Sequence, residues 1–392
     1  MPSVTDRKTE LSWDLGVVRG RLAMDRERET AAPLLRALET GERSLSNLTR
    51  TEWRLLRGVP LIERLLAWST EKRYQDPQGM IRLAHLALCL VQQLSSRRYC
   101  AKLLADLHAR VWTELANAYR VADKLSAAEA ALSQAAVWLS KGSGNVRLTA
   151  RLADVAASFA SDGRRFTDAI ELVTLAIHCY HDLGEAHLMG RALIKKGIYA
   201  GYDDRPEEGI AWIIAGLKKI DASQSPPLVL AAVHAVLCNL VEVGACREAR
   251  DLLALARALY QRDGSFLNRL RLRWLEGRIA LGLDDLETAA DHLNAVRQGF
   301  RLADQSFDAA LASLDLALVY ARQGRPQEII ALAGEMIATF RALKIGREAI
   351  ASLAVLRKAC GQPAVSAERL AGHIHSCAAL VAELQRGRRP SS

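Results

Sequence analysis

Compact residues recur in this chain at a nearly constant interval, and this interval constrains the fold more than any other feature. Six short segments that each follow a turn carry such a residue, with isoleucine in the last. The series is Ala128, Ala169, Gly209, Ala249, Ala289 and Ile329, and subtraction gives one step of 41 and four of 40. We call these the anchor positions. A fixed period predicts an array of stacked repeats, because no single repeat can bury its own apolar face.

Two further series of mostly small residues keep step with the anchor positions. Seven residues after the anchors come Ala135, Ala176, Gly216, Ala256, Val296 and Met336. Twelve residues before them come Ala116, Ala157, Gly197, Leu237, Gly277 and Ala317. Two antiparallel helices approach closely only where side-chain bulk is absent at their crossing. Turn signals lie between the two series, at Gly163, Asp203-Asp204, Gly244, Asp284-Asp285 and Gly324. Each repeat is therefore predicted to be a helix, a short turn and a second helix.

The segment around Trp112 connects this pattern to a known family. Trp112-x-x-Leu115-Ala116-x-x-Tyr119, followed by small residues at the next two offsets, resembles the tetratricopeptide (TPR) pattern. A weaker copy runs from Ser313 to Tyr320, and the resemblance covers about six repeats, from roughly residue 109 to 343. It implies an all-α fold, a right-handed α-α superhelix of antiparallel helical hairpins. The period is longer than the usual one of about 34 residues, as in extended arrays of bacterial TPR regulators, so longer helices or longer inter-repeat turns must absorb the difference.

The ends of the chain lack the marks of the repeat. We expect an N-terminal helical cap over residues 1–75, the repeat array over 76–343, and a C-terminal helical cap with a basic tail over 344–392. Residues 60–74 would supply a degenerate first helix for the pair completed by the helix that starts at Pro77. Atypical terminal repeats are what a solenoid needs to close its open core.

Composition supports a helical protein and limits its surroundings. The 392 residues are 50% hydrophobic and rich in Ala and Leu, which favours packed helices over sheets. The net charge of +9 allows an acidic protein surface or a nucleic acid as partner and requires neither. Seven scattered cysteines without a CxxC motif indicate reduced thiols. We find no secretory signal and no apolar stretch long enough for a membrane span, so we expect a cytoplasmic protein without membrane contact.

Chemistry-bearing motifs do not appear. The segment with His178, Cys179, His181 and His187 and the segment with His373, His375 and Cys377 are the two clusters that a metal could use. We interpret the first segment as the C-terminal end of a helix, where the helix dipole favours histidine. In the second segment the groups are two residues apart, so on a helix neighbouring groups would point to nearly opposite faces. The sequence predicts no catalytic residue, no metal, no cofactor and no enzyme.

The groove side of the first helices carries the functional prediction. In TPR proteins the first helix of each pair lines a concave groove that binds extended peptides. Eighteen residues before the anchors come Arg110, Arg151, Arg191, Ala231, Arg271 and Leu311, and we call the four arginines among them the arginine ladder. Arginine suits carboxylates or phosphates, and Trp274 could stack on an aromatic group or a base. The alternative is a solvated face or ion pairs within a repeat, such as Arg151 with Asp154. The predicted partner-binding residues are Arg110, Asn117, Arg151, Arg191, Lys195, His234, Arg271, Trp274 and Arg278.

A narrower resemblance concerns the TPR proteins that clamp the carboxylates of chaperone tails. Arg191, Lys195 and Asn117 match three positions of that clamp, whereas Thr113 and Val155 replace two others. The prediction is therefore broader: a non-enzymatic scaffold or adaptor that binds a protein or peptide with acidic groups. Two alternatives stay open, a ligand- or peptide-sensing component of a bacterial transcription or signalling system, and an RNA- or DNA-binding repeat protein.

Overall fold

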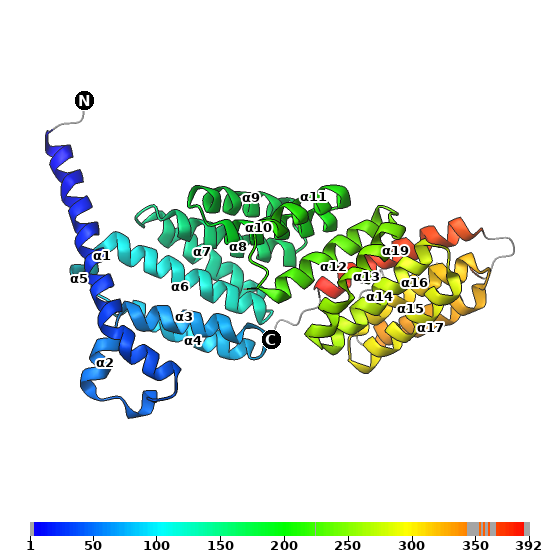
Figure 1. Cartoon of the computed structure of the whole chain (residues 1–392), viewed down its shortest axis with the longest axis horizontal. Coiled ribbons are helices and arrows are strands. Elements are labelled where there is room, and N and C mark those ends of the chain that lie inside the picture. Colours follow the sequence, from blue (N-terminus) through cyan, green and yellow to red (C-terminus); the bar gives the residue numbers. More distant parts are fainter. Residues whose placement is uncertain are drawn as a thin grey trace. The chain divides into compact units, whose positions relative to one another are not determined.

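The computed structural model describes residues 4–223, 225–342, 353, 356, 360 and 366–387. The chain divides into two compact units, Met1–Ala192 and Leu193–Arg389, and the division falls within one helix, α10 (Ala186–Tyr202). The described residues contain helices and turns and no strand (Figure 1). The predicted all-α fold class is therefore confirmed.

The first unit opens with helices that lie outside the regular repeat. They are α1 (Val4–Glu39), η1 (Leu45–Asn47), α2 (Arg50–Leu56), α3 (Val59–Glu71), η2 (Lys72–Tyr74), α4 (Pro77–Val91) and α5 (Ser96–Tyr99). A capping box fixes the start of α2, where the Thr49 hydroxyl accepts the Glu52 N–H and the Glu52 carboxylate accepts the Thr49 N–H. α3 and α4 pack as a pair, and α1 packs against α3.

Six regular helix pairs follow, two of them in the first unit and the third beginning there. They are α6 (Ala101–Val121) with α7 (Leu125–Ser140), α8 (Val146–Asp162) with α9 (Phe166–Asp182), α10 with α11 (Pro206–Leu217), α12 (Pro226–Glu242) with α13 (Cys246–Asp263), α14 (Phe266–Gly282) with α15 (Leu286–Leu302), and α16 (Ser306–Arg322) with α17 (Pro326–Ala342). Most of these helices share one length, 17 residues. The turn inside each pair is three residues long. The repeat period of about 40 residues is therefore reached by long helices and not by long turns within the pairs.

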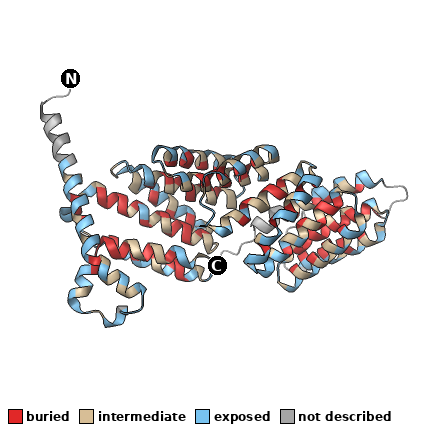
Figure 2. Ribbon diagram, in the orientation of Figure 1, coloured by how far each residue is buried: buried red, intermediate tan, exposed pale blue. Residues whose placement is uncertain are grey.

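The anchor positions lie where the two helices of a pair meet. All six are buried, and buried residues line the facing sides of the helices (Figure 2). One close approach is between α10 and α11. A methyl group on Gly197 would lie 2.5 Å from the carbonyl oxygen of Gly209 and 2.6 Å from Cγ1 of Ile213. The backbones touch there, which explains why glycine occupies both positions.

The turn within each pair contains one residue in the left-handed conformation. These residues are Asp123, Arg164, Asp204, Gly244, Asp284 and Gly324, with φ between 56° and 78°. They stand five residues before the anchors and repeat with the same period. The predicted turn signal Gly163 is the C-cap of α8 and lies in the turn, with φ of −83°, while the left-handed residue of that turn is Arg164.

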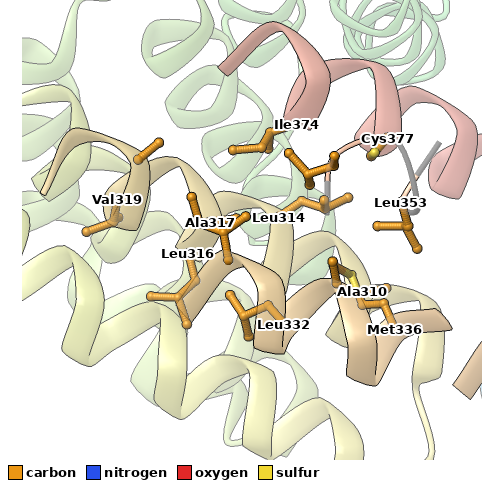
Figure 3. Packing of buried hydrophobic residues seen from close by; sticks show 14 of the residues in the cluster. Ala310, Leu314, Leu316, Ala317, Val319, Leu332, Met336, Leu353, Ile374 and Cys377 are labelled. Atoms are coloured by element: carbon orange, nitrogen blue, oxygen red, sulfur yellow. The ribbon is translucent and has the colours of Figure 1, made fainter. Parts of the chain in front are cut away.

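The described C-terminal helix packs against the last regular pair. α19 (Ala367–Gly387) lies against α16, and its buried residues Leu370, Ile374, Cys377 and Val381 follow helical spacing along one side. Figure 3 shows Ile374 and Cys377 in the apolar cluster that contains Leu314. Much of the predicted range 344–392, including most of its basic tail, lies outside the described residues. The ranges 1–75, 76–343 and 344–392 stay predictions.

Candidate functional site

A cavity of about 910 Å³ lies within the first unit. Its walls come mainly from α1, α3 and the first helices of successive pairs, α6, α8 and the start of α10, and the second helix α9 contributes Tyr180. Among its lining residues are four of the predicted partner-binding residues, Arg110, Asn117, Arg151 and Arg191. The structure therefore gathers these four residues around one space.

Two members of the arginine ladder are already engaged by carboxylates from neighbouring helices. Arg151 binds Glu114 through two hydrogen bonds of 2.7 Å and contacts Asp154 at 3.2 Å. Arg110 contacts Glu63 at 2.9 Å, and Glu63 also binds Arg28 through two hydrogen bonds. Much of the positive charge of the ladder is therefore neutralised inside the protein.

Burial and charge act against each other in the Arg151–Glu114 pair. Burial alone would lower the pKa of the Arg151 guanidinium, but the Glu114 carboxylate outweighs this effect and raises it. Burial alone would raise the pKa of Glu114, but Arg151 holds it below its ordinary value. Both groups therefore stay charged and joined at neutral pH.

Arg191 differs from these two arginines. It is half-buried on α10, lines the cavity and makes no ion pair with any residue that the structure describes. Its charge acts on Tyr180, a buried residue of α9 that also lines the cavity. Burial raises the pKa of Tyr180 to about 12, so its hydroxyl stays a hydrogen-bond donor. The two side chains together offer N–H and O–H donors to an anionic group.

Asn117 is buried and has a partner for only one of its amide atoms. Its Oδ1 accepts hydrogen bonds from Arg120 Nε at 3.3 Å and from Nη2 at 3.1 Å. Arg120 in turn pairs with Asp162 at 2.8 Å. The network fixes the orientation of the amide, whose nitrogen has no acceptor among the described residues.

The lining as a whole carries an excess of positive charge. Seven arginines face five carboxylates, which leaves two positive charges by subtraction. These residues are Arg21, Arg28, Arg73, Arg110, Arg147, Arg151 and Arg191, against Asp25, Glu63, Asp106, Glu114 and Asp154. Like Arg191, Arg21 makes no ion pair among the described residues. The cavity therefore favours a ligand with acidic groups.

Sequence reasoning missed the carboxylates and Tyr180. Glu63 and Glu114 lie 47 and 37 positions from their arginine partners, so no spacing within one helix reveals the contacts. Tyr180 belongs to a second helix, whereas the prediction considered only first helices. Asp154 was the exception, because three residues separate it from Arg151 on the same helix.

The other five predicted residues belong to the second unit. Lys195 is half-buried on α10, and Arg271 is exposed on α14, where it donates to Asn268 at 3.1 Å. His234 on α12 contacts the Tyr260 hydroxyl at 2.9 Å. Burial, together with the positive charges of Arg271 and Arg278, lowers the pKa of His234 to about 4. His234 is therefore neutral at physiological pH.

Trp274 and Arg278 meet at a single carboxylate. The Trp274 indole donates to Asp315 at 2.6 Å and packs edge-on against Phe300, with ring centroids 5.6 Å apart. Arg278 pairs with Glu242 at 2.7 Å and lies 3.8 Å from the same Asp315. These contacts hold the indole in place. Whether any of the nine residues binds a partner stays a prediction.

The two histidine clusters do not form a ligand set. No group of three or more His, Cys, Asp or Glu side chains suited to a metal occurs within the described residues. His181 contacts Asp182 at 3.3 Å, and the His375 ring contacts the carbonyl oxygen of Ala371 at 2.7 Å.

Solved structures provide the comparison, since no family model and no curated protein matches the sequence. The apo form of RapI is similar with a TM-score of 0.56 at 12% identity, covering 72% of this chain and 98% of that one. A Rap protein complexed with competence and sporulation factor gives 0.58 at 11% identity, covering 83% and 87%. Aspartyl phosphate phosphatase F from Bacillus subtilis gives 0.54 at 14% identity, covering 78% and 79%.

The fold is a TPR-like helical repeat. The similarity extends over most of each compared chain, which confirms the helical-hairpin architecture predicted from the anchor positions. At these identities the likeness concerns the fold. Within the described part of this TPR-like chain, no helix has the length and apolar character needed to cross a membrane.

Proposed function

We propose that this protein is a non-enzymatic binding protein that holds a peptide or protein segment with acidic groups in the cavity of the first unit. The observation that carries the proposal is the position of Arg191. It is a cation without a carboxylate partner among the described residues, placed beside Tyr180 in a large cavity where Arg110 and Arg151 are neutralised. An acidic side chain or a terminal carboxylate of the partner would complete this group.

The shape and polarity of the cavity support a peptide-like ligand. Its volume of about 910 Å³ accommodates several residues of an extended chain. Asn117 offers an amide nitrogen to a backbone carbonyl oxygen, while Leu103, Leu107 and Leu188 supply apolar contact. Backbone and side-chain recognition together are typical of peptide-binding grooves.

The compared structures support a binding role. One of the Rap structures was solved in complex with a factor, so this fold can hold a partner. Another is named a phosphatase, which makes catalysis the contrasting case. We favour binding because Arg151, Glu114 and Asp154 of this cavity are engaged in ion pairs and Tyr180 is held protonated. Scaffold and regulatory sensor are both uses of such a site.

A cytoplasmic setting is part of the proposal. None of the seven cysteines is in a disulfide, which suits a reducing compartment. The nucleic-acid alternative receives less support, because Arg110 and Arg151 are paired with Glu63 and Glu114 and would bind phosphates only weakly.

A peptide-display selection on the full-length protein tests the proposal. Random dodecapeptides are selected, and the dissociation constants of the recovered peptides are measured for the wild type, Arg191→Ala and Arg97→Ala. Arg97 is exposed on α5 and does not line the cavity, so it is the matched control. Arg191→Ala is a clean variant because it leaves no described carboxylate unpaired. We expect peptides rich in Asp and Glu, at least tenfold weaker binding by Arg191→Ala, and unchanged binding by Arg97→Ala.

A second arm separates nucleic acid from peptide. A short DNA, single-stranded or duplex, is titrated at about 50 and about 200 mM salt, a range over which phosphate-driven binding falls steeply. Steeply salt-dependent DNA binding that exceeds the peptide affinity would replace the proposal. Recovered peptides without acidic bias, or peptides that Arg191→Ala binds as tightly as the wild type does, would show that this cavity is not the site.

A further inference from the structure

Exposed aliphatic side chains line one part of the first-unit cavity. Val146 begins α8 and is 42% exposed, and Leu183 follows α9 and is 40% exposed. Both line the cavity, as does the half-buried Leu188 on α10. We call these three residues the apolar wall. Single exposed aliphatic residues are common on protein surfaces, but several at one cavity mark a contact surface.

An ion pair joins the two turns that carry Val146 and Leu183. Arg147, the residue after Val146, pairs with Glu185, which lies two residues after Leu183. The turn before α8 and the turn before α10 are therefore neighbours in space. Val146 and Leu183 belong to the same part of the cavity.

Hydrogen bonds hold the segment that carries Val146 in place. The Asp106 carboxylate on α6 accepts the Ser143 N–H at 3.0 Å, and Asn145 Oδ1 accepts the Leu148 N–H at 3.2 Å. Asp106 and Leu148 are themselves buried. A segment that is already fixed loses little conformational freedom on binding, so apolar contact with it adds to affinity.

The apolar wall adjoins Arg191, the cation on which the proposed function depends. Leu188 and Arg191 both line the cavity and are three residues apart on α10. Residues at this spacing are neighbours on one side of a helix, with Cβ atoms about 5–6 Å apart. In an extended peptide, side chains two positions apart point the same way and are separated by about 6.5 Å. The two spacings match.

We propose that the ligand of this cavity is an acidic peptide with a large aliphatic residue two positions from the carboxylate that Arg191 binds. This inference rests on the proposed function and adds the side chain that the peptide must carry beside its acidic group. The aliphatic side chain lies against the apolar wall and removes Val146 and Leu183 from water. Acidic segments without such a residue are poor ligands, because they leave the wall exposed.

The tightest acidic dodecapeptide from the display selection is the probe. Its aliphatic residue at this spacing is replaced by Ser, and both peptides are titrated into the full-length wild type, Val146→Ser/Leu183→Ser and Val137→Ser/Leu175→Ser. The last variant is the matched control, because Val137 on α7 is 47% exposed, Leu175 on α9 is 45% exposed, and neither lines the cavity. Thermal unfolding checks that both variants fold.

We expect Val146→Ser/Leu183→Ser to bind the parent peptide about tenfold more weakly or worse, while the control variant keeps wild-type affinity. The Ser-substituted peptide should lose about tenfold or more against the wild type. Against Val146→Ser/Leu183→Ser it should lose less than about twofold, because the contact is already absent there.

The outcomes separate this inference from the proposed function. Acidic peptides that need Arg191 but carry no aliphatic residue at this spacing would overturn the inference alone. Wild-type affinity in Val146→Ser/Leu183→Ser would do the same, as would an equal loss in the control variant, because the loss would then not come from the cavity. Recovered peptides without acidic bias would overturn both proposals.

Discussion

The Arg151 guanidinium on α8 holds the Glu114 carboxylate on α6 through two parallel hydrogen bonds, Nε to Oε1 and Nη2 to Oε2, each 2.7 Å long. The Glu114 side chain is only 12% exposed, so the pair joins two successive first helices inside the cavity wall. A residue predicted to bind a partner thus already binds its own protein. In the first unit, Arg191 is the ladder member that makes no ion pair among the described residues.

Arg151→Ala should destabilise the protein by about 3–5 kcal/mol, because it leaves the Glu114 carboxylate buried without a partner. Arg110→Ala should change stability by less than about 1 kcal/mol, since Glu63 keeps Arg28. Urea unfolding of both variants measures the difference. The double variant Arg151→Met/Glu114→Leu should recover most of the loss. Equal losses in the two single variants would contradict the role assigned to the pair.

Gly197→Ala should cost several kcal/mol, because the added methyl group meets the backbone of Gly209 and the side chain of Ile213. Gly334→Ala is the control on a regular helix, where no atom lies within 4 Å of the added group. It should stabilise the protein by up to about 1 kcal/mol through helix propensity. Thermal unfolding of the two variants should therefore shift in opposite directions. A neutral Gly197→Ala variant would show that α10 and α11 are not in backbone contact.

Gly324→Ala should destabilise the protein by about 1 kcal/mol, purely through its backbone. Its φ is 67° and no atom lies near the added group, so steric contact plays no part. Gly163→Ala, at a turn residue with φ of −83°, should be close to neutral. Chemical denaturation of the pair tests the assignment. The opposite ranking would mean that the left-handed residue of the α8–α9 turn is misplaced.

His234 should make the protein less stable in mild acid. Its folded-state pKa of about 4 lies below its ordinary value of 6.5, so the unfolded state binds a proton that the folded state refuses. Stability contributed by this group is complete above about pH 6.5 and is lost as the pH falls towards 4, to a total of about 3 kcal/mol. Unfolding free energies of wild type and His234→Gln at pH 7, 5.5 and 4.5 isolate the effect. The two curves should converge or cross as pH falls, and parallel curves would count against a buried neutral histidine.

The fold was largely predictable because its determinants are local and repeated. The anchors, their companions at fixed offsets and the turn positions all act within one helix pair, so their spacing appears directly in the sequence. Gly163 lies in the turn as predicted, but the spacing did not show that the neighbouring Arg164 takes the left-handed conformation. Which residue of a turn takes this conformation depends on how the chain leaves the preceding helix.

The candidate site was only partly predictable. The fixed offset from the anchors correctly brought Arg110, Arg151 and Arg191 to one cavity, because equivalent helix positions face the same way in successive repeats. The spacing carried no information on Glu63 or Tyr180, or on the pairing of Glu114 with a neighbouring helix. The net charge of the cavity lining therefore could not be predicted from the arginines alone.

The sequence by itself determined a chain of helical hairpins, because close packing at a fixed period needs small residues that can be read one repeat at a time. Only the tertiary structure decided which arginines are neutralised and that α19 packs against α16. Those outcomes depend on how far one helix is rotated about its axis and translated along it relative to the next helix. A shift of about one helical turn would change the ion pairs between helices while leaving the repeat pattern unchanged.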